Sequence, residues 1–121
     1  MIRHTKNIKL PMYSCTVNFV VTDNIKLEIS KVYKKYKIPE NEDIEAEGVV
    51  IAPDITNYHL IIDTKYLTHN TIAHEVYHTV VKVTEDRGIV DEEAQAWLAG
   101  HLTDTVYTFL QKKEMTIKNG G

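Results

Sequence analysis

Residues 71–100 read TIAHEVYHTVVKVTEDRGIVDEEAQAWLAG, and this stretch decides the fold. Its apolar residues recur every three or four positions, which is the spacing of one face of a helix. The first of two predicted helices spans about residues 70–86, with Thr68 or Asn70 as the candidate cap at its start. Gly88 is placed to end this helix in a left-handed conformation, which glycine adopts without steric strain.

A second helix is predicted over about residues 91–112, with Asp91 as its cap. Its apolar residues keep helical spacing and define the face that we expect to be buried. That face consists of Ala94, Trp97, Leu98, Leu102, Val106 and Phe109.

The N-terminal half predicts strands and one more helix. Residues 8–21 are rich in β-branched and aromatic residues and are expected to form the first strand. Asp23 is the expected cap of a helix that ends near Lys37. Two short apolar runs, 49–52 and 59–62, then predict a hairpin.

The predicted fold class is therefore α+β, in the element order β-α-β-β-α-α. We expect a small sheet of about three strands packed on helix 70–86. The acidic, polar residues 40–47 are expected to form a loop. A chain of 121 residues is about one domain's worth, so residues 1–121 are assigned to a single domain.

Composition argues against several classes of protein. With 43% hydrophobic and 26% charged residues, the chain resembles an ordinary soluble globular protein. No apolar run approaches the roughly 18 residues that a membrane span needs, and we expect neither export nor membrane binding. The single cysteine, Cys15, cannot form an internal disulfide, which fits a reducing cytoplasm.

The net charge of -3 argues against a nucleic-acid-binding protein, which usually carries a basic face. One local exception is the stretch 31–37, where lysines alternate with Tyr33 and Tyr36. This mixture could follow a phosphate backbone while its rings stack on bases. It also suits the solvated side of an amphipathic helix, and we favour this second interpretation.

Residues 74–78 read HEVYH and carry the candidate chemistry. His74 and His78 lie one helical turn apart on the same face, so both imidazoles can bind a single zinc ion. Glu75 lies about 100° farther round the helix, where it can reach a metal-bound water and act as general base. The alternative is a coincidence of spacing on an ordinary amphipathic helix.

A catalytic zinc site has three protein ligands and one open position, so a further ligand is expected. The candidates are Glu92, Glu93 and His101 on the second helix and His69 before the first. Glu93 borders the predicted buried side, and we favour it. His101 lies about 12 Å farther along the helix, so the same ion is not expected to bind both. Glu92 and Glu93 also have a simpler role as favourable charges at a helix N-terminus.

The pentapeptide HEVYH followed by DEEAQAWLAG resembles the glutamate-type zincins, in which a glutamate before an alanine on the next helix is the third zinc ligand. Glu93 before Ala94 matches that position. More closely than to the zincins in general, residues 71–110 are similar to a group of small phage and prophage proteins that are zincin-like metallopeptidases by resemblance. A looser similarity extends to the peptidase domains of the ImmA/IrrE and SprT groups.

The resemblance implies a zinc metallopeptidase that hydrolyses peptide bonds, with Zn²⁺ held by His74, His78 and Glu93 and water activated by Glu75. It implies a protein or peptide substrate, and the host cytoplasm as location if the chain is phage-encoded. The strand at 58–62 is the candidate edge for an extended peptide, or else an ordinary core strand.

Two questions stay open at this level. His101, Tyr58 and Tyr107 are candidate donors to the charge that develops during hydrolysis, although each also suits a structural role. The alternative function is a catalytically inactive zincin-like fold that binds proteins.

Overall fold

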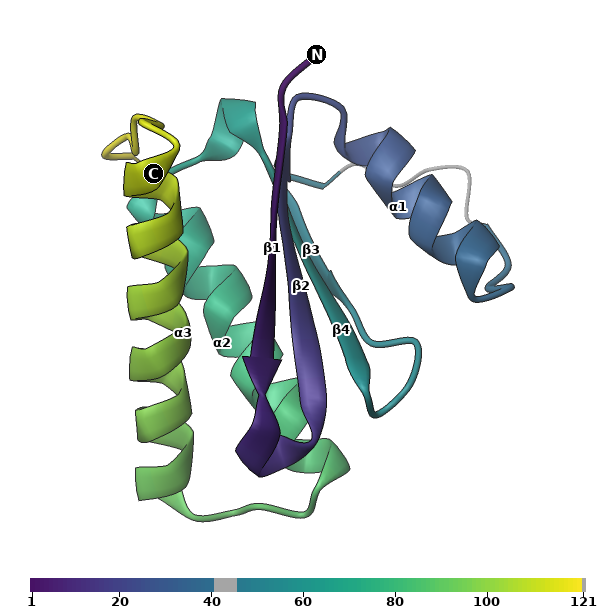
Figure 1. The fold of residues 1–121 in the computed structure, drawn as a ribbon, viewed down its shortest axis with the longest axis vertical. Coiled ribbons are helices and arrows are strands. Elements are labelled where there is room, and N and C mark those ends of the chain that lie inside the picture. The colour runs from purple at the N-terminus through teal and green to yellow at the C-terminus, as the bar shows by residue number, and fades with distance from the viewer. Residues whose placement is uncertain (41–45, 121) are drawn as a thin grey trace.

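The computed structural model of the chain describes residues 1–40 and 46–120, so most of the expected loop at 40–47 lies outside the described residues. Strands, helices and two short 3-10 turns follow one another along the chain (Figure 1). They are β1 (Arg3–Leu10), η1 (Pro11–Tyr13), β2 (Cys15–Thr22), α1 (Ile25–Lys35), β3 (Gly48–Ile51), β4 (Asn57–Asp63), η2 (Thr64–Tyr66), α2 (His69–Asp86) and α3 (Glu92–Lys112).

In the described residues the strands form one mixed sheet in the order β1-β2-β4-β3. β1 pairs antiparallel with β2, β2 pairs parallel with β4, and β4 pairs antiparallel with β3. Helices α2 and α3 lie on one side of the sheet and α1 lies on the other (Figure 1). The predicted α+β class is thus confirmed.

The predicted single strand at 8–21 is wrong, because it is a hairpin of two strands. Pro11 begins a 3-10 turn, and Ser14 ends it in a left-handed conformation with φ of 52°. Proline fixes its own φ and lacks an N–H to donate, so the strand breaks there. In β1 the buried residues are Ile8 and Leu10, and its polar first half gave no strand signal. The sheet therefore has four strands among the described residues, in place of about three.

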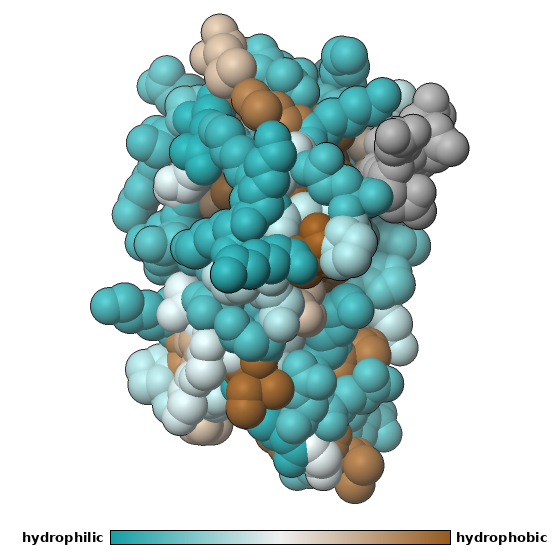
Figure 2. All heavy atoms as spheres, turned by 90° about the vertical axis from the view of Figure 1, so that its right-hand side faces the viewer, coloured by the Kyte–Doolittle hydropathy of each residue, from teal (hydrophilic) through white to brown (hydrophobic). Residues whose placement is uncertain are grey.

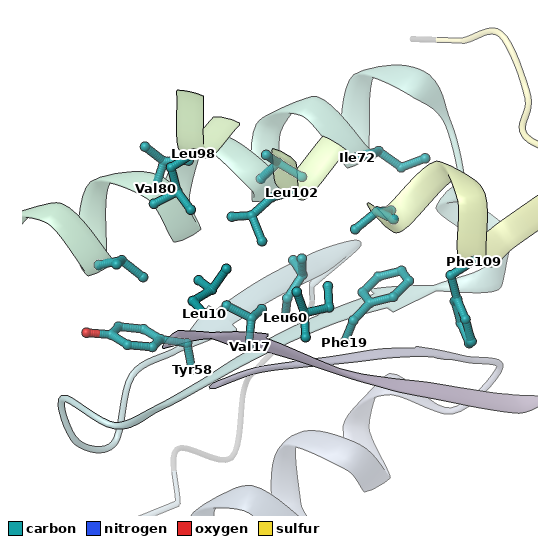
Figure 3. Packing of buried hydrophobic residues seen from close by; sticks show 14 of the residues in the cluster. Leu10, Val17, Phe19, Tyr58, Leu60, Ile72, Val80, Leu98, Leu102 and Phe109 are labelled. Atoms are coloured by element: carbon teal, nitrogen blue, oxygen red, sulfur yellow. The ribbon is translucent and has the colours of Figure 1, made fainter. Parts of the chain in front are cut away.

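The main core lies between the sheet and the pair α2 and α3 (Figure 3). The central strands supply one side of it with Val17, Phe19, Val21, Tyr58, Leu60 and Ile62, and the helices supply the other with Ile72, Val76, Val80, Leu98, Leu102 and Val106. Phe19 meets Phe109 edge to face, with ring centroids 5.8 Å apart. The burial of these apolar side chains fixes α2 and α3 on the sheet.

β4 lies inside the sheet, between β2 and β3. Its residues Tyr58, Leu60 and Ile62 are fully buried, so the interpretation of 58–62 as a sheet edge is wrong and the core-strand alternative holds. The outer strand on this side is β3, which together with β4 lies against α2.

The cap of α1 is Asn24, whose side chain accepts a hydrogen bond from the Leu27 N–H at 3.3 Å. The predicted cap Asp23 is wrong, because its carboxylate accepts instead from the Ile2 N–H at 3.0 Å.

Beneath α1 a smaller apolar cluster contains Val20, Ile25, Ile29, Val32, Ile51 and Ile61. Tyr33 and Tyr36 pack against this cluster while the α1 lysines stay exposed. The face on this side of the molecule is mainly hydrophilic (Figure 2).

The expected ends of α2 and α3 are confirmed. Thr68 accepts a hydrogen bond from the Thr71 N–H at 3.0 Å, Gly88 has a φ of +64°, and Asp91 caps α3. Trp97 is the exception on α3, since it is 54% exposed although we predicted it as buried. One residue along a helix is a turn of about 100°, which moves Trp97 away from the face of Leu98. No helix in the described part of the chain is long and apolar enough to cross a membrane.

Candidate metal centre

The motif at 74–78 lies in the N-terminal half of α2, which runs unbroken from His69 to Asp86. This regular backbone brings His74 and His78 one turn apart on the outer surface, with their Nε2 atoms 3.0 Å from each other. Their ring centroids are 4.6 Å apart, and both side chains are exposed. Two imidazole nitrogens are therefore available to a ligand that approaches from solvent.

Glu75 points in another direction, towards β3, and is 5% exposed. Its Oε1 lies 3.9 Å from His74 Nε2, which is too far for a hydrogen bond. Its Oε2 is buried and accepts no hydrogen bond from any described residue. A buried carboxylate oxygen without a partner is rare in folded proteins, and such a group is often part of a functional site.

Burial raises the pKa of the Glu75 carboxyl above its ordinary value, and the nearby imidazoles of His74 and His78 partly oppose the rise. The cause is that a charged carboxylate loses its water when it is enclosed by protein. A carboxyl group with a raised pKa holds a proton more firmly, which suits a group that must accept one near neutral pH.

The residues fit a zinc ion. A tetrahedral zinc with zinc–nitrogen distances of about 2.0–2.1 Å brings two ligand nitrogens to roughly 3.3 Å, close to the separation of the two Nε2 atoms. Ligand atoms of His74, Glu75 and His78 all lie within 4.8 Å of one another. Glu75 Oε2 has no hydrogen-bond partner among the described residues.

A hollow of about 430 Å³ adjoins this cluster on the side of β3. It is lined by Ala46, Glu47, Gly48, Asn70, Thr71, His74 and Glu75. The start of an outer strand and the start of α2 thus enclose the space in front of the Glu75 carboxylate.

The candidate third ligands lie elsewhere. Glu92 and Glu93 are exposed in the first turn of α3, and His101 stacks on Trp97 with ring centroids 5.3 Å apart. His69 stacks on Tyr107, whose hydroxyl lies 2.6 Å from His69 Nδ1. Across residues 1–40 and 46–120, none of these side chains lies close enough to belong to the candidate metal-binding group of His74, Glu75 and His78.

The placement of Glu93 follows from the connection between the helices. α3 begins soon after α2 ends, and the two helices run in opposite directions (Figure 1). The midpoint of His74 and His78 lies ten residues before Asp86, which is roughly 15 Å along the helix axis at 1.5 Å per residue. Glu93 therefore lies near the far end of α2, and its role as third ligand stays a prediction.

The other candidate donors have partners of their own. The Tyr58 hydroxyl donates to Asp86 Oδ2 at 2.6 Å and accepts from Arg87 Nη1 at 2.8 Å. Burial and the hydrogen bond to Asp86 raise the pKa of Tyr58 to about 12. These contacts tie the C-terminal end of α2 to the sheet, away from the histidines.

Sequence reasoning missed the start of β3 as part of this site. Gly48 and Glu47 line the hollow beside Glu75, although they were predicted as the end of a loop and the approach to a strand. A glycine at the start of an apolar run was the available signal, since glycine in a strand often marks a close approach.

No family model, curated protein or solved structure matches the chain.

Proposed function

We propose that this chain is a zinc-dependent metallopeptidase in which His74 and His78 hold the ion and Glu75 is the general base. One observation carries the proposal. Two imidazole nitrogens lie 3.0 Å apart on one helix face, and beside them is a buried carboxylate whose Oε2 has no described partner. Two histidines to hold the ion and one unpaired carboxylate to accept a proton are part of what metal-assisted hydrolysis needs, and the third ligand stays a prediction.

His74 and His78 would hold a zinc ion, which would supply a Lewis acid that polarises a substrate carbonyl and lowers the pKa of a water molecule to about 7. The protein's own part is proton transfer. The Glu75 carboxylate accepts the proton of the attacking water and then donates it to the leaving amine. The raised pKa of this carboxyl suits both steps, because the group must hold the proton between them.

The surroundings favour an extended peptide as substrate. β3 is the outer strand of the sheet on the side of Glu75, and an outer strand offers unpaired N–H and C=O groups to another chain. The hollow of about 430 Å³ lies between this strand and α2. A peptide that pairs with β3 would pass in front of the Glu75 carboxylate.

Metal analysis tests the ligands. Protein purified without a histidine tag should contain about one zinc per chain, and His74→Ala and His78→Ala should each lose it. Glu93→Ala should lose zinc if the resemblance to glutamate-type zincins holds. Zinc kept in Glu93→Ala would move the third ligand to Glu92 or His101, and the same substitution at those residues would identify it.

Hydrolysis of fluorescein-labelled casein by the zinc-loaded protein tests the reaction. Glu75→Gln should keep the zinc and lose at least about 100-fold in rate, because a positioned general base contributes about 10²–10⁴. No zinc in the parent protein even after zinc is supplied would refute the proposed function.

A second candidate function is a zincin-like fold that binds a protein partner without hydrolysis. The observation in its favour is that, within the described residues, no candidate ligand other than Glu75 itself lies beside His74 and His78. Glu75→Gln distinguishes the two functions, since this substitution should leave partner binding unchanged and abolish hydrolysis.

A further inference from the structure

The Glu75 side chain lies in space that a side chain on β3 would otherwise fill. A Cβ atom placed on Gly48 would lie 2.8 Å from Glu75 Cγ, 3.3 Å from Cδ and 3.2 Å from Oε2. Contacts below 3.0 Å are closer than packed carbon atoms approach each other. The absence of a side chain at position 48 therefore leaves the room that the carboxylate occupies.

Alternation along β3 explains this contact. Val49 and Ile51 pack in the cluster beneath α1, while Val50 packs against the core on the side of α2. Side chains two residues apart share a face of a strand, so position 48 faces α2 as Val50 does. A residue with a side chain at position 48 would thus point at Glu75.

The backbone at Gly48 does not explain the glycine. Among the described glycines the positive φ belongs to Gly88, and Gly48 has a conformation that other residues adopt. Glycine also weakens a strand, because it adds no packing and loses more chain entropy on folding. The one local feature that requires glycine here is the close approach of Glu75.

Neither neighbour can easily move aside. Gly48 pairs with Ile62 in the sheet, and the Asp63 N–H donates to the Glu47 carbonyl at 3.0 Å. On the other side, Ile72 and Val76 hold α2 in the core. Both backbones are fixed, so a methyl group at position 48 would have to displace the Glu75 side chain.

We propose that Gly48 is the positioning residue of Glu75, and that the bare backbone of β3 sets where the carboxylate lies relative to His74 and His78. The effect of Gly48 on catalysis rests on the proposed function. The packing of Gly48 against Glu75 does not depend on that function. Gly48 touches no reacting group and acts through Glu75. The three atoms nearest to a Cβ at position 48 all belong to Glu75, whereas both histidines are exposed on α2.

The first test is a double-mutant cycle in thermal stability, which needs no activity. Gly48→Ala alone should lower the melting temperature by about 3–10 °C, the range expected for an added methyl group in a tight site. The same substitution combined with Glu75→Ala should cause no loss, because the three contacting atoms are gone. Gly100→Ala is the matched control, since a Cβ there meets nothing within 4 Å. An equal loss with and without the Glu75 side chain would overturn the proposal.

The second test uses the zinc-loaded protein and fluorescein-labelled casein. Gly48→Ala should keep its zinc content and its KM and lose about 100-fold in kcat, the scale expected for a catalytic group misplaced by about 1 Å. A general loss of folding would instead lower zinc content and kcat together. Gly48→Ala with full kcat would overturn the proposal. Stability coupling in a protein that hydrolyses nothing would support the placement of Glu75 and refute the proposed function alone.

Discussion

Glu75→Gln is expected to make the metal-free protein more stable at neutral pH, although it removes the proposed general base. The parent buries a carboxylate that is 5% exposed and whose Oε2 has no described partner. Oε1 is 3.9 Å from His74 Nε2, so no direct hydrogen bond to an imidazole offsets the lost water. Glutamine keeps the shape of the side chain and removes the charge.

The size of the effect follows from the burial. An unsatisfied buried polar group costs about 1–3 kcal/mol, and a charged group costs more. The partial attraction of two imidazoles reduces the penalty, and the amide of glutamine is itself left unsatisfied. We therefore expect a gain of about 2 kcal/mol, which is roughly 8 °C in melting temperature at about 4 °C per kcal/mol.

The gain must depend on pH in a defined direction. Burial raises the pKa of Glu75 in the folded state. Above that raised pKa the carboxylate is charged in both states, so the folded protein bears the full free-energy cost of burying the charge. The penalty disappears as pH falls below the unfolded value of about 4.3, where both states are protonated. The difference between Glu75→Gln and the parent should therefore be largest near pH 7.5 and vanish near pH 4.

Thermal denaturation followed by circular dichroism in the presence of EDTA measures the effect at both pH values. Glu85→Gln is the matched control, because Glu85 is exposed on the same helix and its substitution should change stability by less than about 0.5 kcal/mol. A loss of stability in Glu75→Gln at pH 7.5 would show that the carboxylate is satisfied in the folded protein. That result would remove the observation on which the proposed function depends.

Three further predictions concern the fold around the site. Arg87→Ala should lower the free energy of unfolding in urea by about 2 kcal/mol or more, because its guanidinium donates to the Tyr58 hydroxyl and to three backbone carbonyls; an unchanged midpoint would contradict it. Burial, together with the charge of Lys35, lowers the pKa of His59, so the parent should lose stability as pH falls below about 6.5 and His59→Gln should lose less. Parallel pH profiles would refute this assignment. Leu102→Ala should lower stability by about 3 kcal/mol in calorimetry, since the side chain is fully buried, and a loss below about 1 kcal/mol would indicate that the core collapses into the space.

The two C-terminal helices could be predicted from the sequence because their signals are local. Thr68, Gly88 and Asp91 act within a few residues of their own positions, and the structure has them in the expected roles. The first hairpin could not be predicted in the same way. β1 is mostly polar, and Pro11 divides what looked like one continuous β-rich run.

The site shows the same limit. Spacing alone brought His74 and His78 together, because an unbroken helix fixes residues four positions apart. The order of strands decides that the start of β3 lies next to Glu75, and this order depends on contacts between distant residues. A helical wheel gives the direction of Glu93 on its own helix and says nothing about which end of α2 it faces.

The parallel pairing of β2 with β4 has a consequence for how the molecule folds. Thr16 pairs with Asn57, about 40 positions later, whereas β1 with β2 and α2 with α3 meet across short connections. Closing the long segment loses chain entropy before its contacts form, so this pairing is expected to be the slow step. Until it occurs, the hairpins β1–β2 and β3–β4 are separate, and α2 lacks the complete sheet on which it packs. The cluster around Glu75 should therefore assemble late, and zinc added during refolding should bind only after the rate-limiting step.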